Sequence, residues 1–349
     1  MAEKRWMRSG YGEMMRRRNL SVVHEMDGLR ILTGTAHPQL AMDVASLLGY
    51  TSEQVIKNFD GGEYLPKIME SVRRKDVYII QPGGPPDPSR FHLELCFMLD
   101  AAKRASASEL NAVVPYLPFS RQERQTDQQN PNAPRESISA KVIIDQIFDR
   151  GADRLVVCDV HADAEQGFTN SPFDNLHAGD VLIPRLRERI PVENTVILSP
   201  DFGGAKRAKK YNELLHGAGI AIAFKERKDG KAETFDILGS VENKDVVIVD
   251  DILASGESIE NATIIARAKG AGSVSVAVAH GFFLTKDDIS AMERMRRAGI
   301  RKVYVTDTID LPQAIRNDPL IEVVSIAPVL AEAIKRIHLG QPIHQMQVK

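Results

Sequence analysis

A buried strand that runs directly into two acids and a small-residue loop most constrains what this chain can fold into. The apolar run 246–249 is followed at once by Asp250 and Asp251. Continuous apolar runs are typical of parallel strands that helices cover on both faces. The loop 252–258 leads into a predicted helix over 259–268, whose free N–H groups and positive dipole end suit a phosphate. By itself, this pattern fits an ordinary strand, turn and capped helix equally well.

Apolar runs alternate with helical patterns along most of the chain, and this alternation predicts the fold class. The predicted strands cover residues 29–34, 75–82, 110–118, 154–159, 195–199, 220–224, 246–249, 273–279, 302–306 and 321–325. The predicted helices between them include residues 38–48, 92–104, 137–149, 204–215 and 287–298. Strands that alternate with helices predict an α/β fold, with a mostly parallel sheet flanked by helices in each half.

The length predicts two domains, because 349 residues exceed what one core usually supports, about 250–300. We place the boundary in the polar stretch 169–175. This choice gives an N-terminal α/β domain over 28–175 and a C-terminal α/β domain over 176–349. Residues 1–27 are rich in arginine, and we expect them to form a partly ordered basic arm on the surface.

Composition excludes several classes of function. The 45 basic and 47 acidic side chains leave a net charge of −2, so no overall basic field favours nucleic acid. No apolar stretch reaches the roughly 18 residues of a membrane span, and the start of the chain lacks the apolar segment of a secretory signal. Cys96 and Cys158 both stand in apolar runs, as core residues do. We therefore expect a cytoplasmic protein with no nucleic-acid or membrane partner.

Polar and charged residues follow five of the predicted strands, at the ends where open α/β sheets bind ligands. They are Arg121 and Gln122, His161, Asp201, Lys225 and Arg227, and Asp250 and Asp251. Taken singly, His161 fits a structural histidine, Asp201 a turn former, and 225–231 a solvated hairpin tip. Together, oxygen and imidazole ligands beside lysines and arginines favour a magnesium–polyphosphate site over an acyl-transfer site.

Several motifs stand in the order typical of one known family. They are Phe59-Asp60-Gly61-Gly62-Glu63, Pro115-Tyr116 with Arg121-Gln122-Glu123-Arg124, Ile138-Ser139-Ala140-Lys141, Asp159-Val160-His161-Ala162-Asp163, Ser199-Pro200-Asp201-Phe202-Gly203-Gly204, Lys225-Glu226-Arg227, and the segment 250–258. This order resembles the ribose-phosphate diphosphokinase family, also called phosphoribosyl pyrophosphate (PRPP) synthetases, over residues 29–343. The family's fold, two similar phosphoribosyltransferase-type α/β domains, matches the alternation of strands and helices in both halves.

The resemblance implies an activity and a role for each motif. Members transfer the diphosphoryl group of MgATP to the anomeric hydroxyl of ribose 5-phosphate, giving PRPP and AMP, with Mg²⁺ as cofactor. They form oligomers, usually hexamers built from dimers, in which the flap at 59–63 serves a neighbouring subunit's site. The implied roles are catalytic for Lys225 and Arg227, ATP-binding for Phe59, Gly61, Glu63, Arg121 and Gln122, metal-binding for His161 and Asp201, and ribose-5-phosphate-binding for Asp250, Asp251, Ala254, Ser255, Gly256, Glu257 and Ser258.

The chain departs from the family pattern at a few positions. The family's phosphate loop is usually Asp-Thr-Gly-Gly-Thr, so Ala254 removes a carboxylate and Glu257 replaces a residue that is commonly glycine. A glutamate fits poorly if the backbone there needs a positive φ. If its carboxylate faced the 5-phosphate, repulsion at about 4 Å would be about 1 kcal/mol in water and about 4 at a partly buried site. Gly61 stands where the family has aspartate, and Ser137 replaces a common proline.

Two other functions remain compatible with this pattern. The first is a non-catalytic regulatory paralogue that assembles with active subunits, and the second is a nucleotide- or PRPP-sensing protein on the same fold. A phosphoribosyltransferase is less consistent with the sequence, because it would leave the ATP segment and the paired sheets unexplained. The joint presence of the lysine, arginines, histidine and aspartates named above favours the active enzyme.

Overall fold

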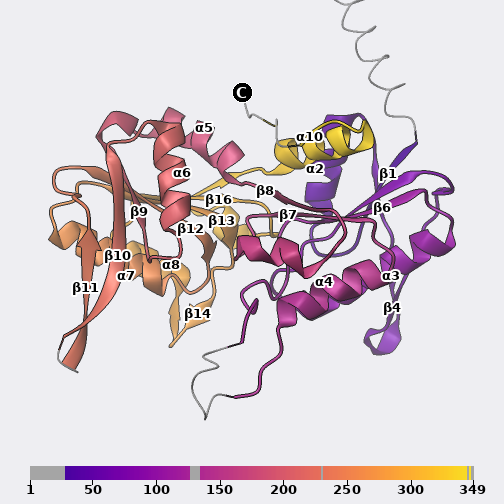
Figure 1. Cartoon of the computed structure of the whole chain (residues 1–349), viewed down its shortest axis with the longest axis horizontal. Helices are drawn as coiled ribbons and strands as arrows, with labels where there is room; N and C mark the ends of the chain where they lie inside the picture. Colours follow the sequence, from indigo (N-terminus) through magenta and orange to yellow (C-terminus); the bar gives the residue numbers. More distant parts are fainter. Residues whose placement is uncertain (1–27, 126–133, 229–230, 344–345, 347–349) are drawn as a thin grey trace, which may run out of the picture.

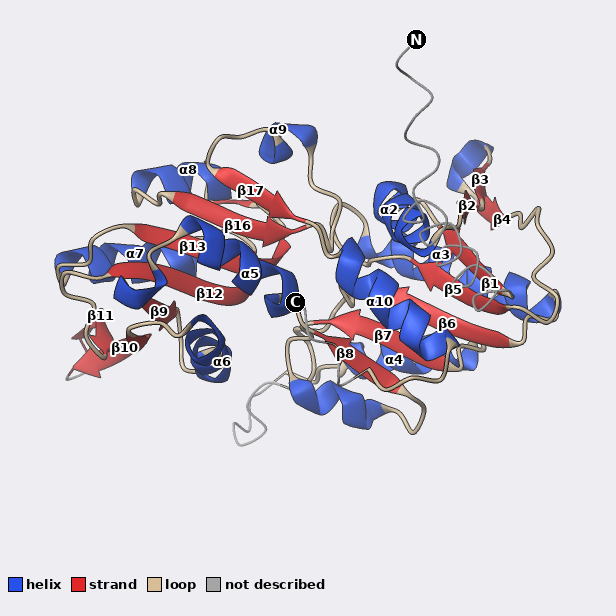
Figure 2. Cartoon of the chain, turned by 90° about the horizontal axis from the view of Figure 1, so that it is seen from above, coloured by secondary structure: helices blue, strands red, loops and turns tan. Residues whose placement is uncertain are grey.

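The computed structural model describes residues 28–125, 134–228, 231–343 and 346. The predicted basic arm at 1–27 lies outside these residues. The chain forms two α/β halves that lie side by side, each built on its own sheet (Figures 1 and 2). The predicted fold class is therefore confirmed. Every described helix is too short or too polar to span a bilayer.

The first half is a parallel sheet with the strand order β2-β1-β5-β6-β7-β8. Its strands are β1 (Leu29–Thr33), β2 (Ser52–Gln54), β5 (Asp76–Ile80), β6 (Glu109–Val114), β7 (Arg154–Cys158) and β8 (Phe173–Leu176). The helices of this half are α2 (Pro38–Leu48), α3 (Pro88–Arg104) and α4 (Ser139–Asp149), with a 3-10 helix at Asp163–Phe168. A separate hairpin, β3 (Ile56–Asn58) and β4 (Tyr64–Pro66), projects from it with a 3-10 turn, Asp60–Gly62, at its tip.

The second half has the strand order β11-β10-β9-β12-β13-β16-β17, in which only β11 runs antiparallel to its neighbour among the described strands. Its strands are β9 (Thr195–Ser199), β10 (Gly219–Lys228), β11 (Lys231–Leu238), β12 (Asp245–Leu253), β13 (Val274–Gly281), β16 (Lys302–Thr306) and β17 (Ile321–Val324). Its helices are α5 (Gly179–Arg189), α6 (Ala205–Leu215), α7 (Glu257–Ala268), α8 (Ala291–Arg297) and α9 (Gln313–Arg316). A 3-10 turn at Val192–Asn194 precedes β9, and a small hairpin, β14 (Thr285–Lys286) and β15 (Ile289–Ser290), precedes α8.

The last helix, α10 (Ala327–His338), returns to the first half and packs on α2 (Figure 1). Alternate residues along each strand face opposite helical layers, as the period of two requires. On β5, Tyr78 belongs to the core beneath α2 and α10, whereas Ile79 belongs to the core beneath α3 and α4. The first of these cores also contains Val247 of β12, so one continuous apolar core spans both halves.

The carboxyl ends of the strands meet between the halves. Figure 2 shows the arrowheads of β16 and β17 directed toward the first half, and that of β7 directed toward the second. The residues that follow these ends are therefore brought close together, although they come from distant parts of the sequence.

Two local predictions were wrong. The helix predicted over 287–298 begins only at Ala291, because residues 285–290 form the β14–β15 hairpin. Asp287 and Asp288 adopt φ values of 52° and 60° at its turn, a left-handed conformation that aspartate tolerates. Ser290 then caps α8 by accepting a hydrogen bond from the backbone N–H of Glu293. The second error concerns the strand predicted over 220–224, because β10 continues through Lys228 and pairs antiparallel with β11, in agreement with the hairpin that one interpretation of 225–231 predicted.

The division at 175/176 stays a prediction, and two features complicate it. Leu176 pairs with Cys158 as the end of β8, a strand that the polar stretch 169–175 concealed. Moreover, α10 comes from the C-terminal end of the chain but covers the first sheet. The halves are therefore not two consecutive, separate lengths of chain.

Candidate functional site

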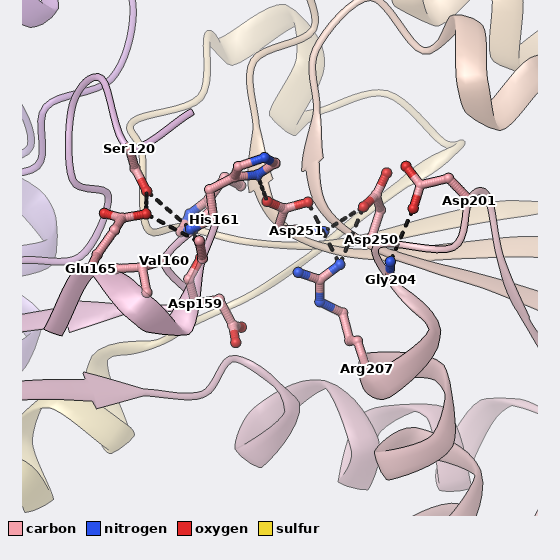
Figure 3. Close-up of polar contacts among 12 residues, drawn as sticks. Ser120, Asp159, Val160, His161, Glu165, Asp201, Gly204, Arg207, Asp250 and Asp251 are labelled. Carbon is pink, nitrogen blue, oxygen red and sulfur yellow. Dashed lines mark hydrogen bonds and ion pairs between the residues drawn. The ribbon is translucent and has the colours of Figure 1, made fainter. Parts of the chain in front are cut away.

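Two adjacent carboxylates at the end of β12 form the centre of the site (Figure 3). Arg207, on α6, places its Nη1 atom 3.2 Å from Oδ1 of Asp250 and 3.6 Å from Oδ1 of Asp251. The side chains of all three residues are mostly buried. Helix α6 starts beside the neighbouring strand β9, so it can reach across the carboxyl end of β12.

His161 connects this cluster to the first half of the molecule. Its Nδ1 atom lies 2.8 Å from Oδ2 of Asp251, although the two residues are 90 positions apart in the sequence. His161 follows the end of β7, whereas Asp251 is on β12. The predicted metal ligand and the predicted sugar ligand thus meet across the boundary between the halves (Figure 3).

Burial and charge give the two carboxylates opposite protonation behaviour. Burial raises the pKa of Asp250 well above its usual range, and the adjacent charge of Asp251 adds to that effect. Burial also acts on Asp251, but the hydrogen bond with His161 and the charge of Arg207 hold its pKa below the usual range. The same hydrogen bond raises the pKa of His161. Burial therefore disfavours the ionisation of both acids together, which suits a ligand that brings hydroxyl groups or a cation.

A buried glutamate supports the loop that carries His161. The Oε1 atom of Glu165 accepts hydrogen bonds from Oγ of Ser120 at 2.6 Å and from the backbone N–H of Ala162 at 3.1 Å. The N–H of His161 donates in turn to Oγ of Ser120 at 2.9 Å. Burial raises the pKa of Glu165 to about 7. Because Ser120 precedes Arg121, this network fixes the start of the predicted ATP segment beside the histidine loop.

Asp201 stabilises the turn between β9 and α6. Its Oδ1 atom accepts a hydrogen bond from the N–H of Gly204 at 3.0 Å, and its carbonyl accepts one from Oγ of Ser199 at 2.6 Å. Asp201 is thus the turn former that one interpretation of the sequence predicted. Its carboxylate also faces the same cavity as the β12 acids, so the two roles are compatible (Figure 3).

A cavity of about 1000 Å³ joins most of the predicted site residues. The predicted residues that line it are Arg121, His161, Asp201, Asp250, Asp251, Ala254, Ser255, Gly256, Glu257 and Ser258. Arg121 and His161 come from the first half and the others from the second. A ligand in this cavity can therefore contact residues of both halves while it lies against the carboxylate cluster.

The phosphate loop accommodates both departures from the family pattern. The positive φ of 78° belongs to Gly256, whereas Glu257 is the first residue of α7. The glutamate is therefore free of the backbone strain considered above. Its Oε2 atom lies 2.5 Å from Nζ of Lys286 on β14, so its charge is paired. Ala254 accepts a hydrogen bond from Leu284 through its carbonyl, which any residue could supply.

The predicted flap and Gln122 do not line this cavity in the single chain. Phe59 is exposed at the base of the hairpin tip, with its N–H donating to the carbonyl of Glu63 at 2.8 Å. Gly61 takes the positive φ of 79° at the tip, which a glycine adopts without strain. Figure 1 shows β4 beneath α3, well away from β12 in the second half.

The two predicted catalytic residues lie on the β10–β11 hairpin, beside the cavity-lining residue Phe224. Lys225 pairs with Phe235 in the antiparallel register, and Arg227 precedes the end of β10 at Lys228. The side chains of Lys225 and Arg227 fall outside the described part of the structure, as does the Asp-Gly turn at 229–230.

Among the described residues, no group of three or more His, Cys, Asp or Glu side chains could by itself hold a metal ion. Such a cage is unnecessary for Mg²⁺, which usually binds one or two carboxylates together with water and substrate phosphates. Asp201, His161, Asp250 and Asp251 all line one cavity. These residues fit a magnesium ion that arrives with a polyphosphate.

Sequence reasoning missed two cations that line or reach this site. Arg207 received no role from the sequence, because its contacts with Asp250 and Asp251 span more than 40 positions. The sequence Asp201-Phe202-Gly203-Gly204-Ala205-Lys206-Arg207 carries the signal, since a helix that starts at Ala205 turns a residue of its first turn toward the strand end. Lys286 was missed because residues 287–298 were predicted to be one helix.

The fold and the site together define a class: a two-half α/β protein in which a strand-end acid pair and the loop 252–258 face a second α/β half. Family models place the chain more narrowly. Residues 29–151 match the N-terminal domain of ribose phosphate pyrophosphokinase, and residues 232–347 match the phosphoribosyl synthetase-associated domain. The chain belongs to the ribose-phosphate pyrophosphokinase family.

Individual relatives agree with this placement. Ribose-phosphate pyrophosphokinase of Aquifex aeolicus is 38% identical over 92% of this chain and 99% of its own length. The enzyme of Wolinella succinogenes is 35% identical over 93% of this chain and all of its own length. Among solved structures, phosphoribosylpyrophosphate synthetase from Mycobacterium smegmatis matches with a TM-score of 0.81 and 32% identity, covering 90% of this chain and 100% of that one.

Proposed function

We propose that this protein transfers the diphosphoryl group of MgATP to the anomeric hydroxyl of ribose 5-phosphate, giving PRPP and AMP. The observation that supports this most is the cavity in which Arg121 and His161 of one half face the acid pair and phosphate loop of the other. Family membership supports the same reaction. The regulatory and sensing alternatives are not favoured by any contact in the site.

The sugar phosphate would bind in the second half. The N–H groups at the start of α7, behind Gly256, suit the 5-phosphate, and the hydroxyls of Ser255 and Ser258 lie beside them in the cavity. Asp250 and Asp251 would accept hydrogen bonds from the ribose hydroxyls. Bound in this way, the sugar would present its anomeric hydroxyl to the first half, where ATP would lie.

ATP would be held from the first half, by Arg121 and Gln122, and by a flap from a neighbouring subunit. In this proposal Phe59, Gly61 and Glu63 act in trans, because they do not line the cavity of their own chain. The protein would therefore work as a homo-oligomer, dimer-based and hexameric as in the family. A monomer would lack part of its adenine site.

Catalysis of this transfer is chiefly positioning and charge stabilisation. Lys225 and Arg227, on a hairpin beside the cavity, would neutralise the charge that spreads over the transferred group. Arginine suits bidentate contact with phosphate, and lysine acts as a compact charge. A magnesium ion held by His161 and Asp201 would supply further neutralisation of the polyphosphate.

An AMP-release assay tests this proposal. Purified protein given ribose 5-phosphate, MgATP and inorganic phosphate should release AMP in step with PRPP. Ribose without its phosphate, and ATP without the sugar, serve as the blank reactions. A protein that binds ATP but releases no AMP at high concentration would contradict the proposal, and activity that appears only after adding another family member would identify a regulatory subunit.

The variant Lys225→Ala tests the assigned catalytic group. We expect turnover to fall by about 10²-fold or more, the size typical of losing one charge-stabilising group, with ATP binding unchanged. Calorimetric titration with ATP separates the two effects. Lys209→Ala, which removes an exposed lysine paired with Glu213 on α6, is the matched control. A fully active Lys225→Ala protein would refute this role.

A further inference from the structure

Lys286 is a cation at the exposed edge of the cavity that the proposed reaction has not used. It lines the cavity together with the phosphate-loop residues Ser255, Gly256 and Ser258. Its Nζ atom lies 2.5 Å from Oε2 of Glu257, and the two side chains are 51% and 49% exposed. The charge of Lys286 is therefore beside the phosphate loop and accessible from solvent.

The backbone of Lys286 is fixed to the loop and to α7. The N–H of Leu284 donates to the carbonyl of Ala254 at 3.0 Å, which holds the hairpin against the loop. The buried Arg294, on α8, donates to the carbonyl of Lys286 at 3.2 Å and to Oε2 of Glu260 at 2.8 Å. The hairpin thus presents a flexible lysine side chain from a firmly held backbone.

We propose that Lys286 positions the 5-phosphate of the sugar substrate, and that it exchanges between Glu257 in the free protein and this phosphate in the complex. The inference deepens the proposed function and rests on it. Lys286 is a binding and positioning residue, and it takes no part in the transfer of the diphosphoryl group.

Charge explains why the exchange would occur. A sugar phosphate carries a charge between about −1.5 and −2 at pH 7, whereas a carboxylate carries −1, so the phosphate attracts the ammonium group more strongly. The pairing with Glu257 also keeps the Lys286 side chain beside the loop before substrate binds, so the ammonium group has only a short distance to move. Lysine suits this role better than arginine, since its compact charge sits on a mobile stem and does not require a fixed bidentate geometry.

The same charges give Glu257 a definite effect. Without Lys286, the carboxylate of Glu257, at the first residue of α7, would compete with a phosphate for the helix N–H groups. The pair is neutral as a whole, so the loop is not made repulsive by the glutamate. Glu257 and Lys286 should therefore affect phosphate binding in opposite directions.

The experiment compares Lys286→Met with wild-type protein, with Lys209→Met as the matched control on an exposed, ion-paired lysine that does not line the cavity. We expect Lys286→Met to raise the KM for ribose 5-phosphate about tenfold, the effect of one partly screened charge contact, while kcat and the KM for ATP stay unchanged. Calorimetry should show weaker binding of ribose 5-phosphate by the same factor and no change for unphosphorylated ribose.

Glu257→Gln and the double variant provide the decisive comparison. Glu257→Gln should lower the KM for ribose 5-phosphate, because Lys286 is then released to the phosphate. The double variant restores a neutral pair, so its KM should return to within about threefold of wild type. A purely structural role for Lys286 predicts instead a lower Tm and a defect that Glu257→Gln does not correct.

The results separate this inference from the proposed function. An unchanged KM in Lys286→Met, with normal wild-type turnover, overturns the inference and leaves the proposed reaction intact. If the wild-type protein binds ribose 5-phosphate but releases no AMP, the proposed reaction fails and the binding series still measures Lys286. A wild-type protein that binds no ribose 5-phosphate overturns both.

Discussion

The acid cluster and the flap are both predicted parts of one site, yet the structure builds them in opposite ways. The side chains of Asp251 and Arg207 are mostly buried and each has several polar partners, which hold them in one arrangement. Phe59 is 45% exposed on a two-stranded hairpin and lies away from the cavity. The acid cluster is therefore assembled within one chain, whereas the predicted flap lies away from it, in keeping with our proposal that the flap acts in a neighbouring subunit.

Removing Arg207 should disrupt the acid cluster, and we expect it to have the largest effect on stability and turnover. Arg207→Met leaves two buried carboxylates without their cation, and we expect the free energy of unfolding to fall by about 3 kcal/mol. Turnover should be lost as well. Urea unfolding at pH 7 measures the loss, with Arg104→Ala as a control because that arginine pairs with Asp100 on an exposed surface of α3. Equal stability of Arg207→Met and wild type would show that the cluster is not preassembled.

The buried Glu165 should make the stability of the same side depend on pH. Its folded pKa is about 7 against an ordinary value of 4.5, so between these two values the unfolded chain has lost a proton that the folded chain keeps. Stability therefore falls as the pH rises from 4.5 to 7, and the fall is complete above 7. Glu165→Gln should remove a change of about 3 kcal/mol in the free energy of unfolding over this window.

Denaturant unfolding of Glu165→Gln and wild type, at intervals between pH 4.5 and 8, measures that slope. The difference between the two proteins isolates Glu165 from the other titrating groups. If the free energies of unfolding of the two proteins changed with pH in parallel, the hydrogen bond from Ser120 would keep the Glu165 carboxylate ionised.

A substitution in the flap should have the smallest effect on the stability of its own chain and a larger effect on ATP binding in the neighbouring subunit. Phe59→Ala should raise the KM for ATP about tenfold, the size of one lost aromatic contact, and leave unfolding unchanged because the ring is exposed. Leu47→Ala, another exposed apolar residue, is the control. In co-expressed oligomers, Phe59→Ala and Asp251→Asn subunits should together be more active than either variant alone. Additive behaviour would place the flap in its own subunit's site.

The comparison also explains how much of the molecule the sequence could predict. Apolar runs located the strands that end at the site, because burial on both faces leaves a strong signal in the chain. The phosphate loop and the strand-end residues Asp250 and His161 followed from the same signal. These are local features, and local chemistry suffices to predict them.

Features that depend on distant contacts were not predictable in this way. The bond between His161 and Asp251 joins residues 90 positions apart, and no pattern in either segment specifies it. The β14–β15 hairpin was hidden because Asp287 and Asp288 also suit the first turn of a helix. The pairing of Glu257 with Lys286 became visible only once that hairpin was known.

Helix α10 has a consequence for how the protein unfolds. Because the last helix covers the first sheet, and one apolar core includes residues of both halves, neither half retains its full core when the other is removed. Thermal unfolding should accordingly proceed as a single cooperative transition. A nick near residue 170 would then yield two fragments that stay associated. The order of helices along this chain thus couples the stability of the first half to that of the second, independently of any ligand.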